Sequence, residues 1–448
     1  MPRLRLALLA LIPLLVVVAA CGASSATPIP TTTGGPPTPL PTAAAPSPTS
    51  PPRLAPPATP SPTPVVALPH LADVAFEYVK TLAEDLGTRE SATDLELAAA
   101  EFISAELEAM AYEVEIRDFL VDRFSRDRPW LIIVSPDEEV LESNFLGLTG
   151  TAEVVASLVS VGLGYEEDFP EGGLEGKIAL IRRGEITFEI KVRNAQAAGA
   201  SAVVIYNNEP DNFRGTLAAQ GDIPALSITQ RDGLHLLDLL GEGEVVLDVK
   251  LVMMSVGSRN VIATKPGDES RTVVVGAHFD TVADTVGAND NASGTAVLLA
   301  IARELQDEEL PITVKFIAFG SEELGLIGSI NYVRSLAPGD VAGIIAMINL
   351  DAIGSGGSLA AGGAQSLVAD SLRFASEMGI DLRPGREPDN ASSDHAVFAR
   401  VGIDILFFLG RDFSRIHSAD DTIEFVEPQL LGDAANLSIA IIRAIASQ

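Results

Sequence analysis

The chain is poor in cysteine and in positive charge, and both shortages narrow what it can be. Cys21 is the only cysteine among 448 residues, so no intramolecular disulfide can form. There are 30 lysines and arginines against 61 acidic residues, and the formal net charge of −31 argues against nucleic acid or an anionic membrane surface as a partner. Hydrophobic residues make up 47% of the chain, and its length leaves room for more than one domain with a large core.

The start of the chain also lacks a comfortable membrane span. Its apolar segment, residues 6–20, is too short for one and follows two arginines. The residues Val18-Ala-Ala-Cys21 are similar to a bacterial lipobox. We therefore predict that residues 1–21 are a lipoprotein signal peptide and that Cys21 is lipidated, which would anchor an extracytoplasmic protein to the bacterial cell membrane. The alternative for Cys21 is a plain signal peptide or a buried thiol.

The next segment, residues 22–68, has almost no charge and is rich in proline, threonine, serine and alanine. Such a composition cannot bury a core, so we predict a disordered linker that holds the folded body away from the membrane.

The most informative stretch of the folded body is Val273-Val-Val-Gly-Ala-His-Phe-Asp280. Consecutive valines are typical of a central parallel strand that is covered on both faces. The apolar run ends on His278 and Asp280, and residues two apart in an extended chain point to the same side. Ligands gather at the carboxyl ends of strands in open α/β sheets. A lone His278 would by default be a core histidine, but here the pattern favours a metal ligand with an acidic neighbour.

Acidic and imidazole side chains recur downstream, close to the ends of predicted strands or in the turns between them. The expected ligand set is two histidines with Asp and Glu oxygens, which suits a pair of divalent zinc ions. One carboxylate is left over, and metal-assisted hydrolysis needs a base for the attacking water. The acids at 322 and 323 could also be a solvated pair at a helix start. These side chains are Asp290 in the turn 287–294, Glu322 and Glu323 after strand 312–318, Asp351 after strand 344–350, and His417 after strand 405–409.

In chain order these pieces read H-x-D, N-D-N-x-S-G, E-E-x-G, a strand-ending D and H-S-x-x-D-T. The set resembles the co-catalytic zinc aminopeptidases of the bacterial leucine aminopeptidase and aminopeptidase Y type, peptidase family M28, to which glutamate carboxypeptidase II and the transferrin receptor ectodomain also belong. The resemblance implies a water activated by two zinc ions. It also implies the following roles: His278 and Asp351 as ligands of one zinc, Glu323 and His417 as ligands of the other, Asp290 as the bridge, Glu322 as general base, and Asp280 as the acid that orients His278.

A second resemblance covers the region of short apolar strands and glycine turns before the metal motifs. Segments 173–184, 195–207 and 223–228 are similar to the protease-associated domain, a β-rich module inserted in many secreted peptidases. We predict this insert at residues 136–255, where it either narrows the active-site cleft or serves as a spacer. The peptidase domain would then comprise residues 69–135 and 256–448.

The order of strands and helices predicts the fold class of the peptidase domain. Helices expected at 71–86, from Ser91 to about 111 and at 430–446 have apolar residues at helical spacing, and 112–117 alternates like a strand. Strands separated by helices indicate an α/β fold with a mostly parallel, mixed sheet and helices on both faces. The resemblance implies that this is the zinc-peptidase fold. The β-rich insert adds a second domain.

The resulting prediction is an exported metallo-aminopeptidase acting on peptides. Three alternatives stay open: a carboxypeptidase of the same superfamily, a receptor-like binding module without catalysis, and a transferase similar to glutaminyl cyclase with one zinc. Many relatives have a tyrosine before the last histidine, where this chain has Ile416, so its oxyanion would depend on zinc or another donor. Side chains expected not to bind metal are His70, His235, Asp394, His395, Asp420 and Asp421.

Overall fold

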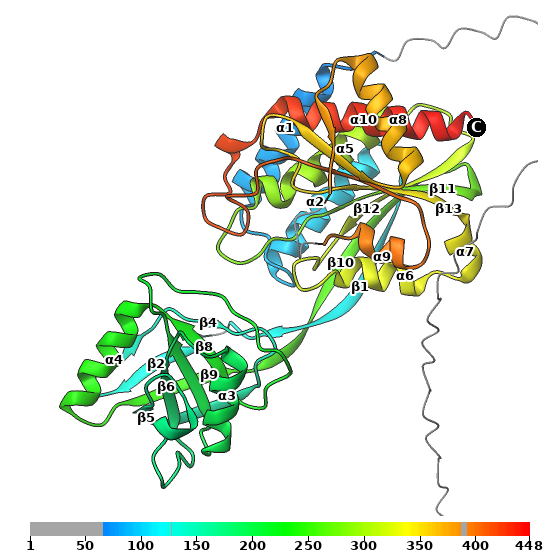
Figure 1. Ribbon diagram of the computed structural model, residues 1–448. Coiled ribbons are helices and arrows are strands. Elements are labelled where there is room, and N and C mark those ends of the chain that lie inside the picture. The colour runs from blue at the N-terminus through cyan, green and yellow to red at the C-terminus, as the bar shows by residue number, and fades with distance from the viewer. Residues whose placement is uncertain (1–65, 127, 387–391) are drawn as a thin grey trace, which may run out of the picture. The chain divides into compact units, whose positions relative to one another are not determined.

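The computed structural model describes residues 66–126, 128–386 and 392–448 (Figure 1). The predicted signal peptide, Cys21 and all but the end of the predicted linker lie outside these ranges. An eight-stranded sheet forms the body that contains the metal motifs. Its strands, in spatial order, are β1 (Glu113–Phe124), β10 (Met253–Lys265), β12 (Ile312–Phe319), β11 (Asp268–His278), β13 (Ile344–Leu350), β16 (Ile405–Leu409), β14 (Leu359–Gly363) and β15 (Leu382–Pro384).

The four central strands of this sheet are parallel, and the strand on either side of them is antiparallel. Strands β12, β11, β13 and β16 run in one direction, whereas β10 pairs antiparallel with both β1 and β12, and β14 pairs antiparallel with β16. The mixed, mostly parallel sheet that the sequence predicts is therefore present. Parallel order brings the carboxyl ends of β11, β12 and β13 to one edge.

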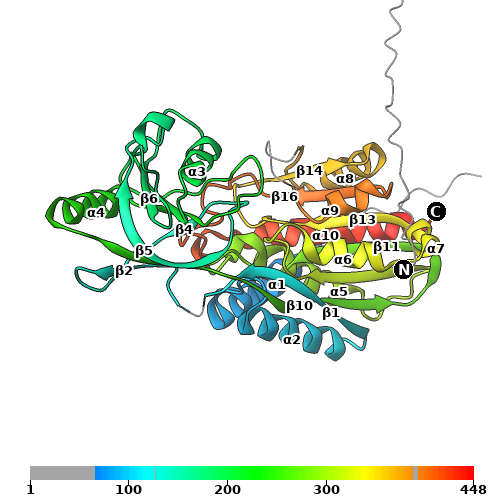
Figure 2. The same ribbon diagram turned by 90° about the horizontal axis from the view of Figure 1, so that it is seen from below.

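Helices cover both faces of the sheet, as predicted (Figure 1, Figure 2). The valines of β11 alternate between two cores: Val273 and Val275 join the larger one, and Val274 joins the smaller one. The helices over the larger core are α1 (His70–Lys80) with its continuation Thr81–Leu86, α2 (Asp94–Ala109), α5 (Gly294–Leu305), α8 (Gln365–Met378) and α10 (Pro428–Ala446). The helices over the smaller core are α6 (Ile327–Ser335), α7 (Pro338–Gly343) and α9 (His395–Arg400).

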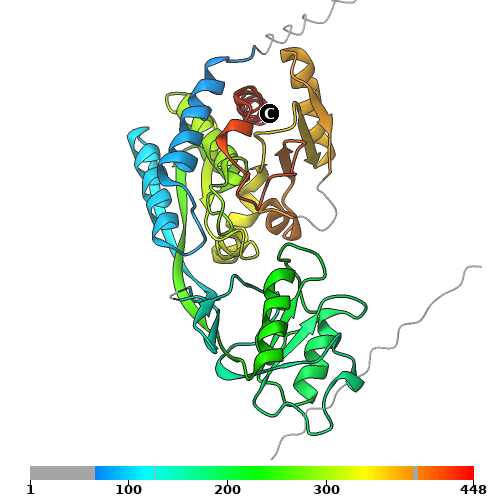
Figure 3. The same ribbon diagram turned by 90° about the vertical axis from the view of Figure 1, so that its left-hand side faces the viewer.

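The last helix, α10, is long and apolar enough to cross a membrane by composition alone. Most of its residues are nevertheless buried within the larger core. Figure 3 shows it almost end-on, between α1 and α8. Its apolar character is thus explained by its place as a core helix of the sheet.

A second eight-stranded sheet, with one helix packed on each face, is formed by the region between β1 and β10. In its parallel part, alternate residues such as Leu180 and Ile181 enter the two cores. The strands are β3 (Glu139–Val140), β2 (Leu131–Ser135), β9 (Val246–Leu251), β5 (Ala152–Ser160), β6 (Ile178–Arg182), β7 (Ala202–Tyr206), β8 (Ala225–Ile228) and β4 (Asn144–Phe145); the helices are α3 (Phe188–Ala197) and α4 (Gln230–Glu242), with a short turn at Glu166–Asp168.

Some element ends differ from those expected from the sequence. The second helix begins at Asp94, not at Ser91, because the Thr93 hydroxyl caps it by accepting the Glu96 N–H. Strand β1 runs on to Phe124 because β10 pairs with it over its full length. Strand β2 already belongs to the second sheet, and β10 starts at Met253, so the chain changes sheets a few residues from the predicted domain boundaries.

Candidate metal centre

The predicted ligands converge at the edge where the parallel strands end. His278 is the last residue of β11, Asp351 directly follows β13, and Glu322 and Glu323 follow β12 after a short turn. These strands are neighbours in the sheet, which explains why residues far apart in sequence meet. His417 lies in the loop after β16, with a left-handed φ of 58°.

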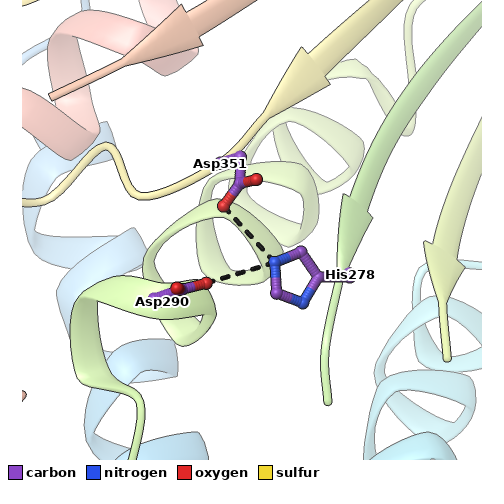
Figure 4. A group of neighbouring side chains, drawn as sticks. All are labelled: His278, Asp290 and Asp351. Atoms are coloured by element: carbon purple, nitrogen blue, oxygen red, sulfur yellow. Dashed lines mark hydrogen bonds and ion pairs between the residues drawn. The ribbon is translucent and has the colours of Figure 1, made fainter. Parts of the chain in front are cut away.

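One group consists of His278, Asp290 and Asp351 (Figure 4). The His278 Nε2 atom lies 3.2 Å from Asp290 Oδ1 and 3.3 Å from Asp351 Oδ1. The other ring nitrogen, Nδ1, is 3.2 Å from the carbonyl oxygen of Asp280. That contact leaves Nε2 facing the two carboxylates, the arrangement expected of a metal-ligating histidine.

The second group consists of Asp290, Glu323 and His417. The His417 Nε2 atom lies 3.0 Å from Asp290 Oδ2 and 3.3 Å from Glu323 Oε2. The remaining Glu323 oxygen, Oε1, is buried and has no hydrogen-bond partner among the residues that the structure describes. Asp290 is shared: one of its oxygens faces His278 and the other faces His417, which is the geometry that a bridging carboxylate requires.

Asp290 is held by its neighbours on both sides in the chain. The Asp421 carboxylate accepts the N–H groups of Asn289, at 2.8 Å, and Asp290, at 3.0 Å. The Asn291 side chain donates to the Leu350 carbonyl at 3.0 Å and accepts the Ala352 N–H at 3.3 Å. Asn291 therefore ties the turn of Asp290 to both residues that flank Asp351. Asp421 is in neither of the ligand groups found among the described residues, and its hydrogen bonds position the turn of Asp290.

Asp280 contacts His278 less directly than the sequence predicts. Its Oδ1 is 3.6 Å from His278 Nδ1, and its carbonyl is closer to that nitrogen. The carboxylate instead accepts the N–H groups of Glu322, at 3.0 Å, and Glu323, at 3.2 Å, and the hydroxyl of Ser91. Asp280 thus fixes the turn that carries the paired glutamates as well as lying beside the histidine.

Glu322 belongs to neither ligand group among the described residues, although it is adjacent to Glu323 and is buried. Burial raises the pKa of its carboxyl well above the usual value, and the negative charges of Asp394, Asp351 and Glu323 add to this, while His278 opposes it. A carboxylate with an elevated pKa that is not a ligand is suited to accept a proton.

The other titratable side chains of the site shift one another's pKa values. Burial alone would lower the His278 pKa, but Glu322 and Asp351 hold it well above 6.5. Hydrogen bonds to Asp290 and Glu323 raise the pKa of His417 to about 10. Burial favours a neutral Asp290, yet its hydrogen bonds to His278 and His417 keep its pKa below the usual value. Such a cluster of competing acids is a place where cations are strongly attracted.

Two residues behind the site were not singled out from the sequence. Arg89 is fully buried, and its guanidinium donates to five carbonyl oxygens, among them that of Phe279 between His278 and Asp280. Burial lowers its pKa to about 10, partly offset by Asp280, Asp421 and Asp290. The other missed residue, Glu96, is treated below. Arg89 lies between the first two helices and Glu96 lies in the second, where the sequence pattern indicates packing and gives no sign of contact with the site.

Four of the residues expected not to bind metal have other contacts, although Asp394 lies close enough to Glu322 for its charge to raise the Glu322 pKa. His70 pairs with Glu304 at 2.9 Å, and His235, on α4, lies 3.1 Å from Glu139. His395 is buried and packs against the Phe407 ring. Asp394 is fully buried, and burial raises the pKa of its carboxyl to about 7. None of the four is in the ligand groups found among the described residues.

The donor set fits zinc. Two imidazole nitrogens and three carboxylates supply the ligand types that zinc takes in catalytic sites, and the ligand atoms of each group lie within 4.8 Å of one another. Two observations favour a cation there: the unpartnered Oε1 of buried Glu323, and the two carboxylates that face each imidazole Nε2. The fold and this donor set define a metallohydrolase.

Comparison with known proteins gives the family. The model of peptidase family M28 matches residues 260–442, and that of the PA domain matches residues 150–236. The chain is 33% identical over 397 residues to the aminopeptidase YwaD of Bacillus subtilis, covering 84% of this chain and 85% of that protein. It is also 33% identical over 294 residues to an aminopeptidase of Pseudomonas aeruginosa, covering 60% of this chain and 54% of that protein. The chain belongs to peptidase family M28 and carries a protease-associated domain.

Solved structures agree with this fold. A zinc aminopeptidase from Bacillus subtilis matches with a TM-score of 0.71 at 30% identity, covering 83% of this chain and 94% of that one. An aminopeptidase from Aneurinibacillus sp. strain AM-1 matches with a TM-score of 0.63 at 31% identity, covering 85% and 96%. A glutaminyl cyclase from Fimbriiglobus ruber, at 17% identity and a TM-score of 0.51, shares the fold alone.

Proposed function

We propose that this protein is a zinc aminopeptidase that removes N-terminal residues from peptides with two zinc ions. The observation that carries the proposal is the position of Asp290, whose two oxygens lie 3.2 Å from His278 and 3.0 Å from His417. A shared carboxylate between two ligand groups is what a pair of co-catalytic ions requires. The names of the relatives, which are aminopeptidases, support the same activity.

In this proposal His278 and Asp351 would hold one zinc, Glu323 and His417 would hold the other, and Asp290 would be shared by both. When bound, the zinc ions would polarise the scissile carbonyl as Lewis acids. They would also lower the pKa of the attacking water, which makes that water easier to deprotonate. Glu322 accepts the proton of the attacking water and passes it to the leaving amine, which its elevated pKa favours. Glu322 and Asp351 also offer negative charge to the free α-amine of a peptide, which would restrict the enzyme to chain ends.

Metal analysis of the purified protein tests the site. We expect about two zinc ions per chain in the wild type and a loss of zinc from His278→Ala. The matched control is His235→Ala, because His235 pairs with Glu139 on the second sheet and should leave the zinc content unchanged. A protein that is folded, active and free of metal would contradict the proposal.

The direction of cleavage is tested with paired substrates. Aminoacyl anilides with a free N-terminus should be hydrolysed, whereas the same anilides with an acetylated N-terminus should not. Cleavage of peptides that have a blocked N-terminus and a free C-terminus would instead indicate the alternative, a carboxypeptidase.

The organisation of the chain is part of the proposal. Residues 1–21 would be a lipoprotein signal peptide that is cleaved before Cys21, so that Cys21 becomes the lipid anchor. Residues 22–68 would be a linker that holds a peptidase domain with a PA insert at 136–255 outside the cell membrane. The sequence of the lipobox and the composition of the linker support it. Cys21→Ser should move the protein from the membrane fraction to the soluble exported fraction, whereas its retention on the membrane would contradict lipidation.

A further inference from the structure

The turn that carries the two glutamates of the site is held by two buried carboxylates. Ser321, directly before Glu322, has a left-handed φ of 53°, which is uncommon for a residue other than glycine. The backbone N–H groups of Ser321 and of the two residues after it all donate to these carboxylates. Those of Glu322 and Glu323 donate to Asp280, and that of Ser321 donates to Glu96 Oε1 at 3.1 Å. The turn therefore depends on a side chain from outside the metal centre.

Glu96 lies near the start of α2 and is only 2% exposed. Its Oε1 also accepts the hydroxyls of Ser258, at 2.8 Å, and Ser321, at 3.3 Å. Its Oε2 accepts the Ala92 N–H at 2.7 Å. One carboxylate thus joins three segments of the chain: the start of α2, strand β10 and the turn after β12. A carboxylate that accepts several hydrogen bonds forms stronger ones than a neutral acceptor would.

Space for this carboxylate is provided by the absence of a side chain at residue 320. A Cβ atom added to Gly320 would lie 2.9 Å from Glu96 Oε1 and 2.4 Å from the Arg259 carbonyl oxygen. Any other residue at position 320 would therefore displace either the turn or the carboxylate. The close approach shows that the turn and Glu96 are fitted to each other.

The fold keeps Glu96 although a buried carboxylate is costly. Burial, and next the negative charge of Asp280, raise its pKa to about 7. The start of α2 does not require a buried carboxylate at position 96, because the Thr93 side chain already caps the helix.

We propose that Glu96 is a positioning residue of the metal centre. By holding the backbone of Ser321, it sets the orientation of Glu322 and the position of the Glu323 carboxylate relative to the other ligands. This rests on the proposed function for its kinetic consequence and on the geometry alone for its effect on metal binding. A misplacement of about 1 Å in a catalytic group can cost on the order of a hundredfold in rate. Loss of a residue that supports a metal ligand costs about 10- to 100-fold in affinity.

Glu96→Ala and Glu96→Gln test the proposal against Glu101→Ala and Glu101→Gln, because Glu101 is on the exposed side of the same helix. For Glu96→Ala we expect kcat to fall about a hundredfold with KM within about twofold of the wild type. Calorimetric titration of the metal-free protein with zinc chloride should show one binding step weakened about tenfold and the other unchanged. Glu96→Gln, which keeps one acceptor oxygen, should show smaller losses in the same direction.

A role confined to the start of α2 predicts a different result. The melting temperature would then fall, while kcat per folded molecule and both zinc steps would match the Glu101 variants, and this outcome would overturn the proposal. If Glu96→Ala does not fold, Glu96→Gln decides in the same way. A wild type that binds zinc but does not cleave aminoacyl anilides would refute the proposed function, yet the zinc titration would still test Glu96.

Discussion

The two sheets of this protein both contain buried parallel strands, but in the described part of the chain only one of them ends in a candidate metal centre. In the second sheet the polar residues after the strands satisfy each other: Arg183, after β6, donates to Asn207, after β7, at 3.0 Å. In the first sheet the strand ends bring together carboxylates that repel one another. Parallel strand ends make a functional site available. The two sheets thus share the geometry of parallel strand ends and differ in charge: among the described residues, only the first gathers carboxylates that other side chains do not neutralise.

The largest difference between the two edges is expected from the shared carboxylate. Asp290→Ala removes a ligand from both groups, so zinc content and kcat/KM should fall together, the latter by at least about a thousandfold. Metal analysis and anilide kinetics measure this. Arg183→Ala, at the matching edge of the second sheet, should leave both values within about twofold, and an equal loss there would break the comparison.

The next effect separates ligand from base. Glu322→Gln should lower kcat by about 10²- to 10⁴-fold while zinc content stays near that of the wild type, because Glu322 is in neither ligand group. Steady-state kinetics and metal analysis of the same preparation measure both. Zinc loss equal to that of Asp290→Ala would show that Glu322 binds metal.

A smaller effect is expected on stability from the buried guanidinium. Arg89→Met leaves five carbonyl oxygens without their donor and the acids without a fixed cation, so the free energy of unfolding should fall by about 3–5 kcal/mol. Urea denaturation measures it. Arg193→Met, an exposed arginine of the second sheet's helix α3, should change it by less than about 0.5 kcal/mol.

The smallest effect is a pH dependence of the metal-free protein. The raised pKa of His417, about 10, stabilises the fold below pH 6.5, and this contribution is lost as pH rises towards 10. The raised pKa values of Glu96, about 7, and Asp421, about 6, act in the same direction, because these acids are more easily protonated when folded. Asp290, with its lowered pKa, has the opposite effect only in strong acid.

The melting temperature of protein treated with chelator should therefore be higher at pH 6 than at pH 9, and zinc should reduce this difference. Scanning calorimetry with and without metal measures it. A metal-free protein that is more stable at pH 9 would contradict the assigned charges.

The sequence predicted most of what local pattern can encode. Strands 344–350 and 405–409 were predicted to the residue because each is a short apolar run with polar neighbours. The full length of β1 was not, because its extent depends on pairing with β10, more than a hundred residues later. The candidate ligands could be predicted because His278 and Asp351 stand at the ends of apolar strands, where a charged or titratable side chain is unexpected.

Supporting residues carry no such signal. Glu96 lies on a helix with ordinary polar spacing, and its partner Ser321 is 225 residues away. Arg89 donates to backbone carbonyls, and carbonyls are the same in every sequence. Which carboxylate holds which amide is decided by the approach of segments in space, so it becomes visible only in the folded chain.

The link made by Asn291 has a further consequence. The uncharged Asn291 side chain is hydrogen-bonded to the residues before and after Asp351. These bonds set the separation of Asp290 and Asp351 before any cation binds. The separation of Asp290 and Asp351 is therefore set by the protein and not by the ion that binds. Cobalt or manganese would meet the same frame as zinc, so exchange of the metal should alter reactivity through the chemistry of the ion and leave the frame as it is.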